Sequence, residues 1–237
     1  MHVPASYTGK ARVPLVIDMH GSGQSATAQI AASTWGKKAD AEGFILICPN
    51  ALNAPWNAGT CCSPSMEQNV DDLGFIRAVV EKRTTDGCID RKRVYAGGSS
   101  GGGLRAYRRA CLAADMFEGI APVSGTDVTM PCVPSAPVTV VEFRGLQDDG
   151  SLQRRHALAV AVAERKGRLR SVQSARPVRW PCYDFEQCLP TKTLCADRTE
   201  VTLCSVHGGH ILYGAAVTDG ASVPDTAWEI SQHGLAP

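Results

Sequence analysis

The sequence lacks any apolar stretch that approaches the roughly 20 residues of a membrane-spanning helix, so no membrane partner is indicated. It also lacks a strong charge of either sign, because 24 Lys and Arg residues balance 23 Asp and Glu residues. Nucleic acid is therefore not indicated as a partner. Met1–Pro4 do not begin a charged region followed by an apolar one, so this chain shows no secretory signal peptide.

Metal-binding patterns are absent as well. The chain has ten cysteines but no C-x-x-C pair, and its histidines lack finger-like spacing, so we expect neither a metal nor a cofactor. Disulfides in an oxidising compartment explain the cysteines better and suggest a secreted protein. Cys48 ends the apolar run 44–48 and is predicted to be a buried free thiol.

With 237 residues and 44% hydrophobic content, the chain can form one substantial core. Apolar runs alternate with helical patterns, which predicts an α/β fold: a mostly parallel sheet covered by helices on both faces. The predicted strands are Pro14–Met19, Phe44–Cys48, Arg93–Ala96, Gly119–Val123, Val138–Phe143 and Glu200–Ser205. The predicted helices are Ala26–Ala41, Val70–Arg83, Gly102–Leu112, Ser151–Lys166 and Pro224–His233. We interpret 1–237 as a single catalytic domain with a Cys-rich loop or cap at 167–197.

The most informative segment lies between a predicted strand and a predicted helix. Residues 97–103 read Gly-Gly-Ser-Ser-Gly-Gly-Gly, which contains the G-x-S-x-G pattern of a nucleophile elbow. Such a turn needs small residues because the strand and helix backbones pass very close to each other. Both Ser99 and Ser100 satisfy the pattern, and spacing alone does not choose between them.

A serine nucleophile needs a histidine base oriented by a carboxylate, in the chain order Ser, Asp or Glu, His. His210 and His207 flank Gly208-Gly209 just after a predicted strand, and His210 is favoured because the two glycines allow an unusual backbone path. Asp148 follows another predicted strand and is the expected acid, with Asp149 as the alternative.

The tetrahedral intermediate of acyl transfer carries a negative charge that backbone N–H groups must stabilise. Gly101, the residue after Ser100, is one expected donor. Ser22, in the loop His20–Gly23 after the first predicted strand, is the other.

These motifs resemble the polyhydroxybutyrate depolymerase and feruloyl/acetylxylan esterase-like family of secreted α/β-hydrolases. Segment 20–26 is similar to the family's L-H-G-C-x-Q-S-A oxyanion segment, and 69–76 to its V-D-D-V-G-F helix start. Segment 89–103 is similar to I-D-P-x-R-V-Y-A-T-G-x-S-N-G-G, which places the nucleophile at Ser100. Gly208-Gly209-His210 matches the family's catalytic histidine motif. The resemblance thus implies an α/β-hydrolase with the triad Ser100, Asp148 and His210.

The sequence departs from the family at two places. The family's H-G-T-x-D acid loop reads Arg-Gly-Leu-Gln-Asp at 144–148. The family's first strands precede a V-P-x-x-Y segment that is matched here by Val3–Tyr7, so N-terminal edge strands are expected to be missing.

The sequence also suggests two further sets of contacts. Trp56 and Tyr213 lie near the catalytic loops and are expected to line a substrate cleft. Among the cysteines, Cys88 could bridge Cys111, and Cys182 or Cys188 could bridge Cys204.

The leading hypothesis is a serine carboxylic ester hydrolase that forms an acyl-enzyme. The resemblance implies small or polymeric aryl, feruloyl, acetyl-sugar or short hydroxyalkanoate esters as substrates. Two alternatives are a serine peptidase on the same fold and a catalytically inactive secreted binding protein. The oligomeric state is not indicated by the sequence.

Overall fold

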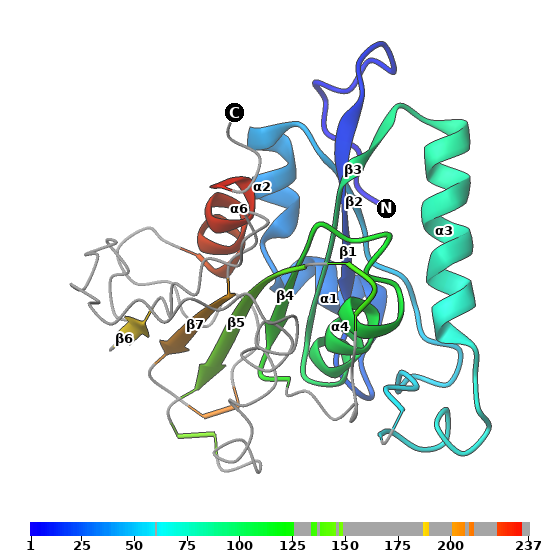
Figure 1. Cartoon of the computed structure of the whole chain (residues 1–237), viewed down its shortest axis with the longest axis vertical. Coiled ribbons are helices and arrows are strands. Elements are labelled where there is room, and N and C mark those ends of the chain that lie inside the picture. The colour runs from blue at the N-terminus through cyan, green and yellow to red at the C-terminus, as the bar shows by residue number, and fades with distance from the viewer. Residues whose placement is uncertain are drawn as a thin grey trace.

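A seven-stranded sheet forms the centre of the protein in the computed structural model (Figure 1). The structure describes residues 1–59, 61–125, 134–136, 138–145, 147–148, 187–189, 201–206, 209–210 and 222–233. The strand order is β2-β1-β3-β4-β5-β7-β6, and only β6 runs antiparallel to its neighbour. The strands are β1 Val13–Met19, β2 Ile45–Ile47, β3 Ile89–Ser99, β4 Gly119–Val123, β5 Thr139–Gly145, β6 Gln187–Leu189 and β7 Val201–Val206. The predicted mostly parallel sheet is therefore confirmed.

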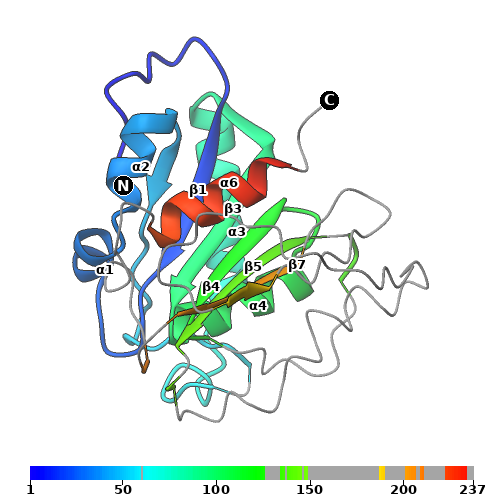
Figure 2. The ribbon, with the colours of Figure 1, turned by 90° about the vertical axis from the view of Figure 1, so that its left-hand side faces the viewer.

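Helices cover both faces of this sheet (Figure 2). The helices are α1 Ala26–Ala32, α2 Trp35–Glu42, α3 Asp72–Asp86, α4 Gly101–Leu112 and α6 Val223–His233. One buried cluster joins α3 and α4 to the sheet through Ile76, Val80 and Ala106. A second cluster joins α2 and α6 to the opposite face through Trp35, Ala39 and Trp228. The alternating side chains of the strands thus supply two cores, one on each face.

The predicted helix Ala26–Ala41 is wrong in one respect, because two short helices occupy that range. Thr34 lies between them with φ 56°, a left-handed conformation that ends α1 before α2 begins. The strand β3 is longer than predicted, because it begins at Ile89. The predicted helix Ser151–Lys166 lies outside the described residues, as does the Cys-rich segment 167–197 except for the strand β6.

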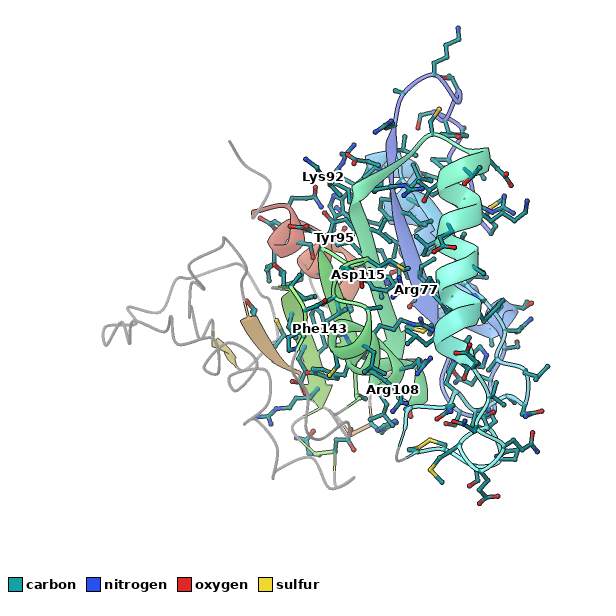
Figure 3. All side chains as sticks on the ribbon, turned by 45° about the vertical axis from the view of Figure 1, so that its right-hand side comes forward. Arg77, Lys92, Tyr95, Arg108, Asp115 and Phe143 are labelled. Atoms are coloured by element: carbon teal, nitrogen blue, oxygen red, sulfur yellow. A yellow bond between two sulfur atoms is a disulfide. The ribbon has the colours of Figure 1, made fainter. Side chains whose placement is uncertain are left out.

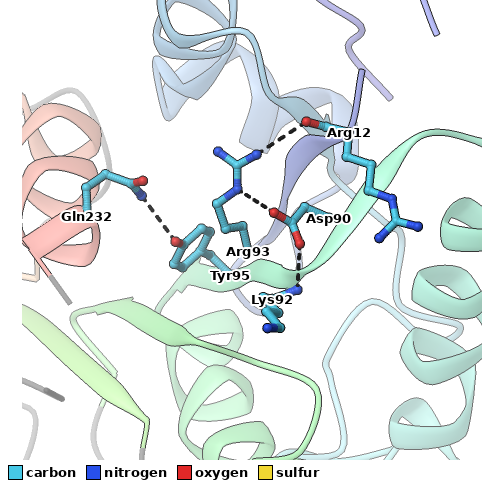
Figure 4. A network of polar contacts seen from close by, with 6 residues as sticks. All are labelled: Arg12, Asp90, Lys92, Arg93, Tyr95 and Gln232. Atoms are coloured by element: carbon cyan, nitrogen blue, oxygen red, sulfur yellow. Dashed lines mark hydrogen bonds and ion pairs between the residues drawn. The ribbon is translucent and has the colours of Figure 1, made fainter. Parts of the chain in front are cut away.

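Polar side chains form ion pairs and hydrogen bonds between and within elements at the surface of the molecule. Arg77 of α3 pairs with Asp115, which follows α4, at 3.3 Å (Figure 3). On β3, Arg93 binds Asp90 at 2.8 Å and donates to the backbone oxygen of Arg12 (Figure 4). These contacts are partly exposed, so each contributes little to stability.

Parallel pairing brings the carboxyl ends of four strands to the same edge of the sheet. Met19 of β1 pairs with Gly98 of β3, and Ser99 of β3 pairs with Val123 of β4. Val123 in turn pairs with Phe143 of β5. The loops after these strands therefore converge, which is where ligand sites form in parallel α/β sheets. Among the described helices, none has the length and apolar character needed to cross a bilayer.

Candidate active site

Ser100 occupies a strained turn between β3 and α4. Its backbone has φ 51° and ψ −115°, and its N–H donates to the backbone oxygen of Val123 at 2.8 Å. A positive φ is uncommon for a residue with a side chain and costs free energy that the surrounding structure must offset. The surroundings are correspondingly tight, because a Cβ at Gly98 would lie 2.6 Å from the carbonyl carbon of Gly102. A Cβ at Gly102 would lie 2.1 Å from the oxygen of Met19.

The two candidate serines differ in access to solvent. Ser99 is 1% exposed, and its hydroxyl donates to Gln29 Oε1 at 3.0 Å. Gln29 in turn donates from Nε2 to Asp18 Oδ2 at 3.0 Å. Ser100 is half-buried and is the N-cap residue of α4. Only the Ser100 hydroxyl is therefore placed to meet a molecule arriving from solvent.

Asp148 and His210 come together at the same edge of the sheet. His210 Nδ1 lies 2.9 Å from Asp148 Oδ2. The carboxylate is 4% exposed, whereas the imidazole is 48% exposed. With Nδ1–H donating to the carboxylate, Nε2 keeps a lone pair that can accept a proton. The alternatives Asp149 and His207 lie outside the described residues.

The two segments expected to supply oxyanion donors are in direct contact. A Cβ at Gly101 would lie 2.6 Å from Ser22 Oγ and 3.3 Å from Ser22 N. Gly101 is the first residue of α4, so its N–H has no partner within the helix. The helix N-terminus also favours negative charge. This contact therefore offers two neighbouring backbone N–H groups near Ser100.

His20 fixes the peptide unit that carries the Ser22 N–H. The ring is 1% exposed, its Nδ1 lies 2.8 Å from Gly21 O, and its Nε2 accepts from Ala51 N–H at 3.1 Å. A single neutral tautomer, with the proton on Nδ1, satisfies both contacts. Because a trans peptide is planar, the Gly21 carbonyl and the Ser22 N–H point in opposite directions. Holding the carbonyl therefore aims the N–H. In the sequence His20 is recognisable only as part of the oxyanion motif, and its role in orienting Ser22 becomes visible only in the fold.

Trp56 packs against the loop His20–Gly23 from the interior of the protein. Its side chain is 0% exposed, and its indole N–H donates to the His20 oxygen at 3.0 Å. The centroids of the Trp56 and His20 rings are 5.2 Å apart. The expectation that Trp56 lines a substrate cleft does not fit this burial, because a fully buried ring is inaccessible to a substrate. Tyr213, the other expected cleft residue, lies outside the described residues.

A buried polar cluster anchors the loop that contains Trp56 to α4. Arg105, 1% exposed, donates from Nη1 to Asn57 O at 2.7 Å. Asn57 N–H donates to Asp72 Oδ2 at 2.7 Å. Burial lowers the pKa of Arg105 to about 10, and the nearby Asp72 opposes that shift. Arg109, 0% exposed, donates to the Asp72 backbone oxygen at 2.8 Å. No pattern in the sequence indicated that these two arginines are buried.

One disulfide joins adjacent residues near the site. Cys61 and Cys62 are bonded to each other, and Ser22 Oγ lies 3.8 Å from Cys62 Sγ. The expectation of disulfides is confirmed, although this pairing was not foreseen. Cys48 is a buried free thiol, as predicted. Burial raises the pKa of the Cys48 thiol, so it stays protonated.

Both suggested bridges are wrong. Cys88 is a free thiol, whereas Cys111 is disulfide-bonded, so the two are not joined. Cys204 is free and buried, although the backbone of Cys188 lies opposite it in the β6–β7 pairing. Cys182 lies outside the described residues. Within the described part of the chain, no three His, Cys, Asp or Glu side chains gather as a metal site would require.

Comparison with curated proteins finds esterases that are similar to this chain in sequence. The chain is 33% identical over 157 residues to feruloyl esterase B of Piromyces equi. The aligned segment covers 62% of this chain and 28% of that protein. It is 29% identical over 149 residues to the bifunctional acetylxylan esterase/xylanase XynS20E of Neocallimastix patriciarum, covering 63% of this chain and 21% of that protein. It is 25% identical over 240 residues to the probable feruloyl esterase C of Aspergillus niger, covering 97% of this chain and 81% of that protein. The chain thus spans less than a third of the first two relatives.

Solved structures show the fold. The crystal structure of native sOPH matches with a TM-score of 0.59 at 18% identity, covering 99% of this chain and 82% of the other. The acetyl xylan esterase from Aspergillus awamori matches with a TM-score of 0.56 at 14% identity, covering 98% and 92%. No protein-family model matches the chain. The α/β-hydrolase fold and the resemblance to feruloyl and acetylxylan esterases are confirmed.

Proposed function

We propose that this chain, a relative of feruloyl and acetylxylan esterases, is a serine carboxylic ester hydrolase that works through an acyl-enzyme. The observation that carries the proposal is the placement of Ser100. Its half-buried hydroxyl sits on a left-handed turn at the sheet edge, beside the contact between Gly101 and Ser22. The His210–Asp148 pair, which follows β7 and β5, supplies a base and an acid of the required types at the same edge.

In the proposed reaction, Ser100 Oγ attacks the ester carbonyl while His210 Nε2 takes the hydroxyl proton. The Gly101 and Ser22 N–H groups stabilise the oxyanion of the tetrahedral intermediate. His210 then gives its proton to the leaving alcohol, and the acyl group remains on Ser100. A water molecule, deprotonated by His210, hydrolyses the acyl-enzyme and restores the serine. Asp148 holds the imidazole in the tautomer that these steps need.

The proposed substrates are feruloyl or other aryl esters, acetyl-sugar esters and short hydroxyalkanoate esters, small or polymeric. The names of the relatives support the first two classes. We also place the protein outside the cell, since the Cys61–Cys62 disulfide and the bonded Cys111 are typical of oxidising compartments.

A fluorophosphonate probe and p-nitrophenyl acetate test the nucleophile. The probe should label Ser100, and Ser100→Ala should lower kcat by at least about 1000-fold. Ser99→Ala is the matched control. It removes a buried hydroxyl that contacts Gln29, so it should lower the stability of the fold and leave labelling of Ser100 intact. An adduct on Ser99, or a folded wild type without adduct and without turnover, would overturn the assignment.

Peptide anilides and an ester panel test the reaction class. A serine esterase should hydrolyse p-nitrophenyl acetate and leave peptide anilides intact, whereas a peptidase should cleave both. Feruloyl, acetyl-xylooligosaccharide and hydroxybutyrate esters at equal concentration, compared by kcat/KM, then identify the acyl group.

A further inference from the structure

The Cys61–Cys62 disulfide is linked twice to the loop that carries the proposed oxyanion donor Ser22, once directly and once through Trp56. Both cysteines are half-buried. In the direct link, Ser22 Oγ contacts Cys62 Sγ at 3.8 Å. In the other, Cys62 N–H donates to Trp56 O at 3.2 Å, and Trp56 donates from its indole to His20 O at 3.0 Å. The disulfide therefore touches the loop through a side chain and reaches it again through a buried tryptophan.

Hydrogen bonds to buried groups fix the segment that holds the disulfide. Asn57 N–H binds the buried carboxylate of Asp72, and its oxygen accepts from Arg105 of α4. Ser65 Oγ donates to the backbone oxygen of Pro55 at 2.7 Å. These hydrogen bonds tie the segment that holds the disulfide to α4, the helix that begins at Gly101. A change in the Cys62 side chain therefore changes its position relative to Gly101.

We propose that the Cys61–Cys62 disulfide positions Ser22 for the reaction, so that reducing it lowers turnover. The inference rests on the proposed ester hydrolysis. In the disulfide, the Cys62 sulfur is held beside the Ser22 hydroxyl by its bond to Cys61. In the dithiol, each side chain is free to adopt its own rotamer, and Cys62 Sγ is no longer held against the loop. The oxyanion donor then samples more orientations, and the preorganisation that stabilises the transition state is reduced.

The chemistry of the change is a thiol–disulfide exchange with an external dithiol. The Sγ–Sγ bond breaks, the two sulfurs take up two electrons and two protons, and the dithiol closes to its own cyclic disulfide. Oxidation by a small-molecule disulfide reverses the exchange. Neither cysteine takes part in the reaction with the ester, so both act as positioning residues.

The experiment compares oxidised and reduced enzyme on p-nitrophenyl acetate in a Cys88→Ser background. That substitution removes a half-buried free thiol that contacts Gly9 O, so it leaves the basal activity unchanged. Alkylation and peptide mapping identify the cysteines that reduction frees. We expect kcat to fall by about fivefold to tenfold with little change in KM, and to return on reoxidation. The fall should be smaller than the roughly 100-fold loss that follows removal of an oxyanion donor.

A double variant, Cys61→Ser with Cys62→Ser, is the matched control for every other disulfide of the chain, including the one made by Cys111. It should have the lowered kcat before any reduction, and reductant should change it little further. If the double variant loses activity equally on reduction, the effect belongs to a different disulfide and the proposal is wrong. A reduced enzyme that is alkylated at residues 61 and 62 and retains full kcat also contradicts it.

Hydrogen–deuterium exchange gives a readout that does not depend on turnover. The peptide that covers residues 20–24 should exchange faster after reduction, while a peptide within α3 should not change. Unchanged exchange at 20–24 contradicts the positioning role even if no ester is hydrolysed. Conversely, an oxidised enzyme that turns over esters but ignores reduction contradicts this inference alone and leaves the proposed function standing.

Discussion

Two hydrogen bonds made by His20 have separate consequences. The Nδ1 contact holds the Gly21 carbonyl at 2.8 Å and so orients the Ser22 N–H, whereas the Nε2 contact holds Ala51 N–H at 3.1 Å in the next loop. The first contact acts on the proposed oxyanion donor, and the second acts on loop position. Substitutions that retain one contact at a time should therefore separate catalysis from stability.

His20→Asn and His20→Gln form such a pair. The Asn amide can place a donor where Nδ1 lies, and the longer Gln can place an acceptor where Nε2 lies. Each variant loses one buried hydrogen bond, so each should be destabilised by about 1–2 kcal/mol in urea unfolding. We expect kcat to fall much further in His20→Gln than in His20→Asn. Equal losses of kcat, or a greater loss in His20→Asn, would show that the Nδ1 contact does not orient the donor.

The Asp148 carboxylate should matter for the state of His210 more than for stability. Asp148→Asn keeps the shape of the side chain but can donate to Nδ1, which favours the wrong tautomer of the imidazole. Because Nε2 then carries the proton, it can no longer accept one from Ser100, and kcat should fall by about 10⁴-fold. Stopped-flow or steady-state assays at pH 7–9 measure the loss. A variant with near-normal kcat would show that another carboxylate orients the base.

The first two residues of α4, Gly101 and Gly102, have different neighbours. A Cβ at Gly102 would meet the backbone oxygen of Met19 at 2.1 Å, whereas a Cβ at Gly101 would meet the Ser22 Oγ at 2.6 Å. Backbone of a central strand cannot yield, but a serine side chain can change rotamer. Gly102→Ala should therefore lower the free energy of unfolding by about 3 kcal/mol.

Gly101→Ala should cost less than about 1 kcal/mol in stability and still lower kcat, because the new methyl displaces Ser22. Thermal unfolding and p-nitrophenyl acetate turnover measure the two effects. If Gly101→Ala proves the more destabilising of the two variants, the neighbours of these glycines differ from those described here.

The same elements show what the sequence could and could not predict. The glycines around Ser100 marked the turn because only residues without a Cβ allow β3 and α4 to pass so closely. Strand ends could be predicted from short apolar runs, which is why Asp148 and His210 were identified. The break at Thr34 could not be predicted, because no glycine or proline marks it. Spacing alone did not choose between Ser99 and Ser100, and the family resemblance favoured Ser100. The physical reason is visible only in the fold, where Ser99 is buried against Gln29, a residue 70 positions away.

At the scale of the whole molecule, the last described helix ties to the sheet and to an early helix. Trp228 of α6 stacks on Phe44 with ring centroids 4.4 Å apart and meets the Tyr95 ring edge-on at 5.8 Å. Asp225 pairs with Lys38 of α2 at 3.1 Å. These contacts hold α6 against the sheet face opposite α3 and α4. We therefore expect α6 to unfold together with the whole molecule and not by local fraying.

Tyr95 makes this connection sensitive to alkaline pH. Its hydroxyl accepts from Gln232 Nε2 at 3.2 Å (Figure 4), and burial raises the pKa of Tyr95 to about 12. An acid whose pKa is raised on folding favours the folded state while it is protonated. That stability is complete below the unfolded-state pKa near 10 and is lost as the pH rises toward 12.

Tyr95→Phe should therefore be less stable than the wild type by about 1 kcal/mol at pH 7, since one hydrogen bond is lost. Between pH 10 and 12 the wild type should lose a further contribution on the order of 2 kcal/mol that the variant does not have to lose. The difference between the two proteins should then shrink and reverse. Urea unfolding at pH 7, 10 and 11.5, followed by tryptophan fluorescence, measures it. Parallel stability curves over this range would mean that the phenol is not buried under α6, and that this helix is not held against the sheet as described.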